Sequence, residues 1–168
     1  MTHPKADICV VDETRVIGPG VAVLPPLPRM LFWMGPVAEQ ALVVNVRGRG
    51  FVVITGCGHP EIELTLAAAE KVVDAPVYAV VGGLHLPVHP IGTPLLPQAV
   101  FGNPNWPWRP INEDDAHAVI DRIQERGPSP IALSGHDSTQ WTLDAFGHAF
   151  GDRYQTLRVG EEIVVTAA

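Results

Sequence analysis

Cysteine and charge are both scarce in this sequence of 168 residues. Cys9 and Cys57 are the only cysteines, which is too few for a disulfide framework or a CxxC zinc site. Charged residues make up 17% of the chain, and acidic residues outnumber basic ones by 18 to 11. Because a surface that binds nucleic acid is normally basic, the net charge of −7 predicts no nucleic-acid partner.

Long apolar runs are absent as well. No uninterrupted apolar stretch approaches the roughly 18 residues that cross a bilayer, and residues 1–13 lack a basic region followed by a long apolar run. We therefore expect no membrane segment and a reducing, cytoplasmic setting. Hydrophobic residues make up 46% of the chain, which suffices for one core, so residues 1–168 are interpreted as a single domain.

Proline and glycine are abundant, with 17 and 16 residues. They concentrate in residues 18–36 and 87–110, which we interpret as long ordered loops. The second loop carries Trp106, Trp108 and Arg109 within FGNPNWPWRP. Two interpretations stay open: a wall or lid of a substrate site, with Arg109 holding an anionic group, or an Ω-loop folded on its own aromatic side chains.

The remaining segments alternate between strand and helix patterns. Strands are predicted at residues 8–11, 21–24, 41–46, 51–55, 76–81, 130–134, 154–159 and 162–166, and helices at 61–73, 112–126 and 138–150. Pro60 suits the first turn of one helix, and Asn112 can cap another. Alternating strands and helices predict an α/β fold.

Three of the predicted strands share a local design. FVVIT runs into GCGH and ends at His59, VYAVV runs into GGLH and ends at His85, and IALS runs into GH and ends at His136. In an α/β sheet, ligands bind beyond the carboxyl ends of the strands, and glycine lets the backbone turn sharply there. Because imidazole is a common zinc ligand, the pattern predicts a metal site of three histidines. The alternative of three unrelated loop histidines stays open.

Two further residues adjoin these histidines. Asp137 follows His136 and could act as a metal ligand, a catalytic base, a hydrogen-bond partner of a ligand, or the cap of the helix that starts near Ser138. Cys57 could be a soft metal ligand or a small buried residue. The sequence contains no Walker loop, no GxGxxG and no GxSxG, so nucleotide-binding and serine-hydrolase classes lack their signatures.

The segments VVITGCGHPEIELTL, GGLHL and SGHDST together resemble the metallo-β-lactamase-fold hydrolases. The sequence is most similar to the branch that includes the dihydropterin-linked aminobenzene ribofuranosyl phosphate synthases. In that branch, GCSH, GGxHL and CHCTG-type segments occur in the same order. The resemblance covers roughly residues 15–166, and it departs from the family at Asp137, where the late motif has a cysteine.

The resemblance implies a mixed sheet flanked by helices in an αββα sandwich, with one or two divalent metals at an edge, zinc first and manganese or iron as alternatives. By position, His59 and His136 match metal-binding histidines of the family. His85 falls near the place of a metal-bridging aspartate in many relatives, and Asp137 becomes the catalytic candidate. The implied reaction is attack of an activated water on an ester, a phosphoester or a similar electrophile in a small-molecule substrate.

The HxHxDH motif of the family is missing from the chain. Since family members take metal ligands from both halves of the fold, this sequence resembles the C-terminal half alone. We therefore expect a partner, either a chain that supplies the N-terminal half or a second copy of this chain. The alternative is a catalytically inactive homologue that binds a partner or a metal.

Overall fold

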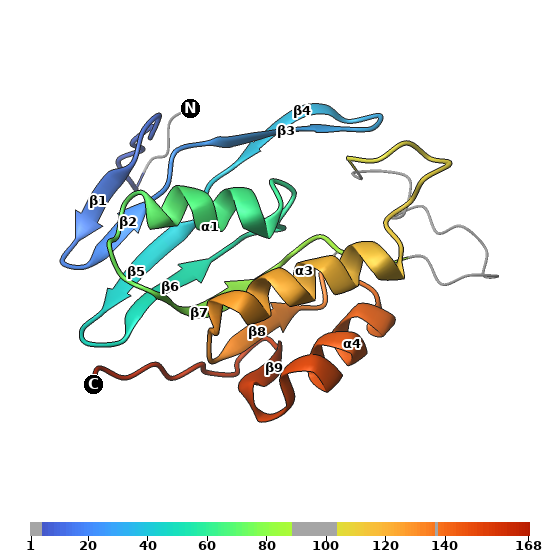
Figure 1. Cartoon of the computed structure of the whole chain (residues 1–168). Coiled ribbons are helices and arrows are strands. Elements are labelled where there is room, and N and C mark those ends of the chain that lie inside the picture. The colour runs from blue at the N-terminus through green and yellow to red at the C-terminus, as the bar shows by residue number, and fades with distance from the viewer. Residues whose placement is uncertain (1–4, 89–103, 137) are drawn as a thin grey trace.

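The computed structural model describes residues 5–88, 104–136 and 138–168. Its helices are α1 (Ile62–Glu70), α3 (Glu113–Arg126), α4 (Gln140–Phe150) and the short 3-10 helix η1 (Gly151–Arg153). Its strands are β1 (Arg15–Gly18), β2 (Val21–Val23), β3 (Leu27–Leu31), β4 (Gly35–Glu39), β5 (Leu42–Val46), β6 (Gly50–Ile54), β7 (Val77–Gly82), β8 (Ile131–Ser134) and β9 (Tyr154–Leu157). The predicted alternation of strands and helices is confirmed (Figure 1).

The strands of the described residues form a mixed seven-stranded sheet in the order β1-β2-β5-β6-β7-β8-β9. Neighbours from β1 to β6 are antiparallel, and those from β6 to β9 are parallel. The carboxyl ends of β6, β7 and β8 therefore share one edge of the sheet, as the histidine pattern requires. Strands β3 and β4 form a separate two-stranded hairpin, which is drawn at the top of Figure 1.

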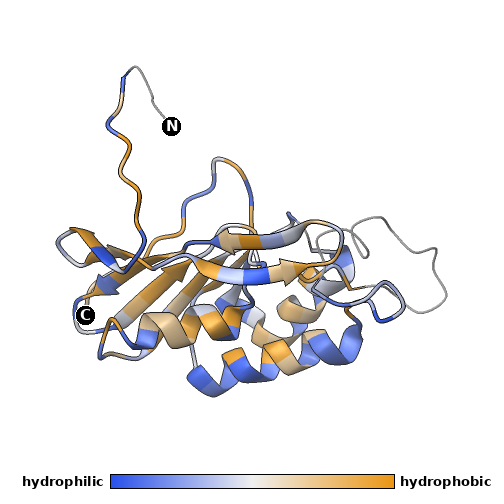
Figure 2. Cartoon of the chain, turned by 90° about the horizontal axis from the view of Figure 1, so that it is seen from above, coloured by the Kyte–Doolittle hydropathy of each residue, from blue (hydrophilic) through white to orange (hydrophobic). Residues whose placement is uncertain are grey.

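The main core lies between the helices and one face of the sheet. Figures 1 and 2 both place α1, α3 and α4 on the same side of the strands. Its buried side chains are Val43, Phe51, Val53, Val80, Ile131 and Leu133 from the strands and Ile62, Leu66, Ile120, Ile123 and Phe146 from the helices. The helices therefore cover this face of the sheet and bury its apolar side chains.

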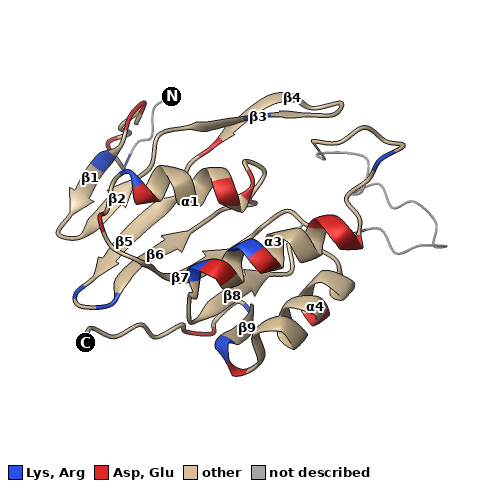
Figure 3. Ribbon diagram, in the orientation of Figure 1, with Lys and Arg blue, Asp and Glu red and all other residues tan. Residues whose placement is uncertain are grey.

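The opposite face of the sheet carries a smaller apolar cluster. Val46, Val52 and Ala79 form its buried centre, and Val44, Ile54, Tyr78, Val81 and Val165 are the partly buried side chains around it. Strands β5 to β8 contain no charged residue, and Figure 3 shows the Lys, Arg, Asp and Glu residues on helices, turns and other strands. Within the described residues, no helix covers this second face.

Helix α3 begins and ends as its capping residues predict. Asn112 accepts a hydrogen bond from the Asp115 backbone, and the Asp115 side chain accepts one from the Asn112 backbone, which makes a capping box at α3. Gly127 ends that helix with φ of 68°. The prediction at α1 was less accurate, because Pro60 lies outside the helix, which begins after Glu61.

Three sequence predictions are wrong. Residues 18–36 are not one loop, since they contain β2, β3 and the start of β4; the prolines are tolerated because β3 and β4 pair only with each other. Residues 8–11 form no strand, and Val10 is 76% exposed. Residues 162–166 also form no strand. Val165 packs against the cluster on the second face of the sheet, and the Ala168 N–H donates to the Arg47 carbonyl.

The proline-rich segment 87–110 is only partly described, since residues 89–103 lie outside the described part of the chain. Its described end, residues 104–110, is irregular as predicted. None of the helices in the described residues is long and apolar enough to cross a membrane.

Candidate metal centre and adjoining cavity

The backbone segments that leave β6 and β7 lie directly against each other. The Gly83 N–H donates to the Gly56 carbonyl at 2.9 Å, and the Thr55 hydroxyl donates to the Gly83 carbonyl at 2.7 Å. A Cβ atom on Gly58, whose φ is +88°, would lie 2.4 Å from the Gly83 oxygen. Glycine is therefore required here by both the backbone conformation and the close approach.

This close approach brings two of the predicted histidines together. The rings of His59 and His85 lie with their centroids 4.2 Å apart and their planes tilted by 36°. His85 is only 6% exposed and has φ of 46°, a conformation rarely adopted by residues other than glycine. A buried polar side chain on a strained backbone is a feature that often marks a functional site.

Glu39, the last residue of β4, contacts the same histidine from the other side. Its Oε1 contacts His59 Nδ1, and its Oε2 accepts the Gly58 backbone N–H at 2.9 Å. Glu39 could not be predicted from the sequence, because it lies between the predicted loop at 18–36 and the predicted strand at 41–46 and has no motif around it. Its link to His59 depends on the fold, since the two residues are 20 positions apart.

Potential metal-ligand atoms gather at this point. Glu39, Cys57 and His59 each offer one ligand atom, and these atoms lie within 4.8 Å of one another, the only such group of three in the described part of the chain. Sulfur, nitrogen and oxygen donors are the set that zinc accepts. The residues present therefore fit a divalent metal by their chemistry. His85 contacts the His59 ring but does not belong to this group.

His136 lies on the turn after β8, and its side chain is exposed. That turn is fixed next to the His85 segment, because the Leu86 N–H donates to Ser138 Oγ and the Thr142 hydroxyl donates to the Leu86 carbonyl at 2.7 Å. His136 does not belong to the group of close ligand atoms found among the described residues. Its role as a ligand stays a prediction, and Asp137 lies outside the described residues.

A cavity of about 210 Å³ adjoins the two histidines. Its lining includes His59, His85, the start of α1 and one side of α3, together with Pro104 and Asn105. The charged residues of the wall are Glu61, Glu63, Asp115 and Arg122. The cavity therefore offers polar groups of both signs next to the candidate metal centre.

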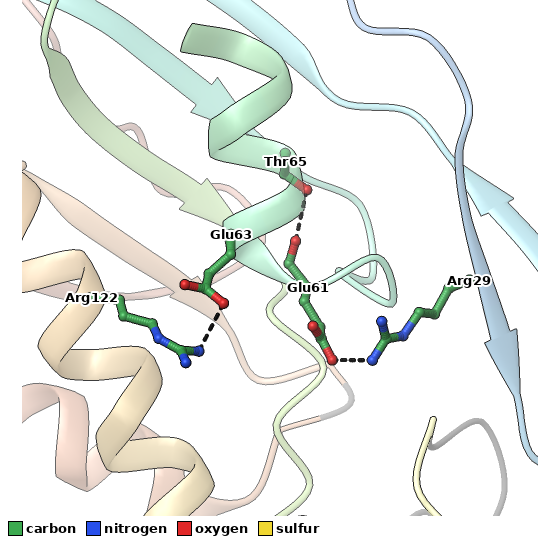
Figure 4. Close-up of polar contacts among 5 residues, drawn as sticks. All are labelled: Arg29, Glu61, Glu63, Thr65 and Arg122. Atoms are coloured by element: carbon green, nitrogen blue, oxygen red, sulfur yellow. Dashed lines mark hydrogen bonds and ion pairs between the residues drawn. The ribbon is translucent and has the colours of Figure 1, made fainter.

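The two acidic residues at the start of α1 reach in opposite directions (Figure 4). Glu61 pairs with Arg29 of β3, and Glu63 pairs with Arg122 of α3 at 2.8 Å. All four side chains are partly exposed, so each pair adds little stability. The first pair links the segment after His59 to β3, and the second links α1 to α3.

The predicted substrate-binding residues lie beside this cavity. Trp106 and Trp108 stack with centroids 5.1 Å apart, and Trp106 also contacts Phe32 at the tip of the β3–β4 hairpin. Arg109 is exposed, and its N–H donates to the Trp106 carbonyl. These three predicted residues do not line the cavity, although the preceding Pro104 and Asn105 do, so their contact with substrate stays a prediction.

Comparison with solved structures identifies the fold. The chain is similar to Tm1679, a metal-dependent hydrolase of the β-lactamase superfamily, with a TM-score of 0.66 and 20% identity over 94% of this chain and 58% of that one. The fold is metallo-β-lactamase-like. A metallo-β-lactamase from Hirschia baltica also matches, with a TM-score of 0.40, 14% identity and coverage of 92% and 55%.

The predicted fold class is thereby confirmed. The chain spans 58% of the length of Tm1679. The sequence matches no family model, and no curated protein matches it. At this level of identity, similarity of structure establishes the fold and leaves the chemistry to be argued from the residues.

Proposed function

We propose that this chain is the C-terminal half of a metal-dependent hydrolase and that His59, His85 and His136 hold a divalent metal, zinc first among the candidates. The observation that carries the proposal is the contact between the His59 and His85 rings at the shared carboxyl edge of β6 and β7. Similarity in fold to a metal-dependent hydrolase supports it. The order of the GCGH, GGLHL and SGHDST segments supports the finer assignment to the dihydropterin-linked synthase branch.

A divalent ion at this site would supply Lewis acidity for activating a water nucleophile and polarising the electrophile. The chain's own residues provide the surroundings. The His59 and His85 rings form one part of the cavity wall, and α1 and α3 form another, so a small substrate would be held beside the metal ligands. Asp137, next to His136, is proposed to orient the water or a ligand.

Substrate contacts are proposed for the aromatic loop. Trp106 and Trp108 present a stacked, exposed apolar surface beside the cavity, and Arg109 offers a guanidinium group for an anionic portion of the substrate. The electrophile is an ester, a phosphoester or a similar group. This assignment rests on the position of the loop and on the reaction type of the proposed fold family.

The second face of the sheet supports the half-fold part of the proposal. Its partly buried cluster around Val52 and Ala79 has the composition of an interface core, and the strands that carry it contain no charge. In an αββα arrangement, a second sheet covers such a face. We propose that a chain carrying the HxHxDH half, or a second copy of this chain, packs there.

The experiment that tests the hydrolase proposal is a reconstitution assay. The chain is mixed with a separately expressed N-terminal half from a metallo-β-lactamase-fold relative or from the adjoining reading frame, and hydrolysis of ester, phosphoester and lactam substrates is measured with and without added zinc. Metal-dependent activity should require both halves and should be lost in His59→Ala. Full activity of the chain alone would contradict the half-fold proposal.

A second candidate function is favoured by the same apolar face. A catalytically inactive homologue could use this face to bind a partner without any reaction. Stable association with a partner, together with no metal-dependent hydrolysis in the reconstituted complex, would favour this candidate over the hydrolase.

A further inference from the structure

We propose that Glu39 is a positioning residue that fixes the orientation and the tautomer of His59. The consequence for metal binding rests on the proposed function, whereas the orientation of the ring does not. Glu39 uses both of its carboxylate oxygens on the His59 segment: Oε1 contacts Nδ1 of the ring, and Oε2 accepts the Gly58 N–H at 2.9 Å. One side chain therefore holds both the ring and the backbone that carries it.

Contacts of the β3–β4 hairpin fix the position of Glu39. Glu39 pairs with Leu27 in the β3–β4 register, and the buried side chains of Leu27 and Leu31 anchor that hairpin. The neighbouring Gln40 side chain donates to the Leu24 carbonyl at 3.1 Å. These contacts do not involve the loop that carries His59. The position of Glu39 is therefore set independently of that loop.

The same hairpin holds the loop at a second point. Arg29 of β3 pairs with Glu61, two residues after His59. Glu61 has φ of 69°, so the backbone is strained at this second contact with the hairpin. Two independent contacts to one element limit the freedom of the segment around His59.

The chemistry of the contact decides which ring nitrogen is left for a metal. An ionised carboxylate accepts hydrogen bonds and donates none, so His59 Nδ1 must carry the proton. Nε2 then keeps its lone pair, and His59 lines the cavity. A carboxylate that holds Nδ1–H of a histidine is a recurrent means of orienting a metal ligand and raising its basicity.

Glu39 could instead be a ligand itself, since it belongs to the close group with Cys57 and His59. Both of its oxygens, however, already contact polar groups of the protein, and the side chains of Glu39 and His59 are only 21% and 14% exposed. Direct coordination would require at least one of these contacts to break. The observed geometry therefore favours a positioning role.

The test combines two measurements on the wild type, Glu39→Ala and Glu39→Gln, with Arg29→Met as the matched control. The first is the tautomer of His59 in metal-free protein, from long-range ¹H–¹⁵N correlation spectra at about pH 9, well above the ordinary histidine pKa of about 6.5. The second is zinc stoichiometry and affinity by competition with a chelating indicator. Arg29→Met removes the other hairpin contact to the same loop and leaves Glu39 in place.

We expect the Nδ1–H tautomer in the wild type and in Arg29→Met, and a predominantly Nε2–H ring in Glu39→Ala. Zinc affinity should fall roughly 10–100-fold in Glu39→Ala with unchanged stoichiometry. Glu39→Gln should lie between, because its amide keeps one acceptor oxygen. Arg29→Met should change affinity by less than roughly fivefold, since an exposed ion pair contributes about 1 kcal/mol or less.

A wild-type His59 in the Nε2–H form, or an unchanged tautomer in Glu39→Ala, would overturn the proposal. An oxygen ligand that X-ray absorption spectra show at the zinc site of the wild type and not at that of Glu39→Gln would overturn it by making Glu39 a ligand. Failure of both Glu39 variants to fold would reduce its role to a structural one and would also overturn it. If the wild type binds no zinc, the proposed function fails, while the tautomer measurement still decides the role of Glu39.

Discussion

Gly58 and Gly83 approach so closely that their backbones leave no room for a side chain. A Cβ atom on Gly58 would lie 2.4 Å from the Gly83 oxygen, and one on Gly83 would lie 2.5 Å from the Gly56 oxygen. The contact joins the loops that follow β6 and β7, and each loop carries one histidine of the candidate metal centre. The geometry of that centre therefore depends on backbone packing as well as on its ligands.

Gly58→Ala should destabilise the fold by about 1–3 kcal/mol, because alanine is strained at a positive φ and its methyl group would clash with the backbone. Gly18→Ala is the matched control, since nothing lies within 4 Å of its Cβ position and its φ is not positive. It should change stability by less than about 0.5 kcal/mol. Urea denaturation measures both, and equal stability of the two variants would contradict the packing argument.

The strand-end pattern predicted that His59, His85 and His136 gather beyond the strand ends, and the structure brings the rings of His59 and His85 into contact. Parallel neighbours β6 and β7 end at the same edge, so residues that follow them are neighbours whatever lies between them in sequence. Glu39 could not be found in this way, because its contact arises from a hairpin whose position relative to the sheet is set by tertiary packing. The same limit explains why residues 18–36, rich in proline and glycine, were interpreted as a loop.

Asn112→Ala should lower the free energy of unfolding by about 0.5–2 kcal/mol, because it removes the side chain that caps α3. Helix α3 supplies Asp115 and Arg122 to the cavity wall, so fraying at its start would also loosen the cavity. Thermal and urea denaturation followed by circular dichroism measure the change. Asp121→Ala, on the same helix and exposed, is the control, and a loss as large as that of Asn112→Ala would contradict the capping assignment.

Tyr154 gives the structure a pH dependence at the alkaline end. Burial raises the pKa of its phenol above the ordinary value of 10.0, and Asp144 adds to the rise against a lowering by the hydrogen bond with Thr156. The folded state therefore keeps the Tyr154 proton where the unfolded state loses it, so this contribution is complete below about pH 10 and disappears at higher pH.

Urea denaturation across this range should show a steeper loss of stability in the wild type than in Tyr154→Phe. Identical slopes for the wild type and Tyr154→Phe would show that the raised pKa does not affect stability.

The second face of the sheet should mediate association. Val44→Glu places a charge among the partly buried side chains of that face, so it should weaken binding of the N-terminal half or of a second copy while the helix-covered core stays intact. Leu64→Glu, at an exposed position on α1, should have no such effect. Sedimentation velocity measures the association, and equal association of the wild type and Val44→Glu would mean that this face is not the interface.

The central claim is that His59 and His85 bind a divalent metal, and the most direct test is the zinc content of the purified chain after equilibration with zinc and removal of free metal. Plasma mass spectrometry should find at least one zinc ion per chain in the wild type and in His148→Ala, whose histidine is exposed on α4. It should find a loss of bound zinc in His59→Ala and in His85→Ala. Equal zinc content in all four proteins, or none in the wild type, would contradict the account.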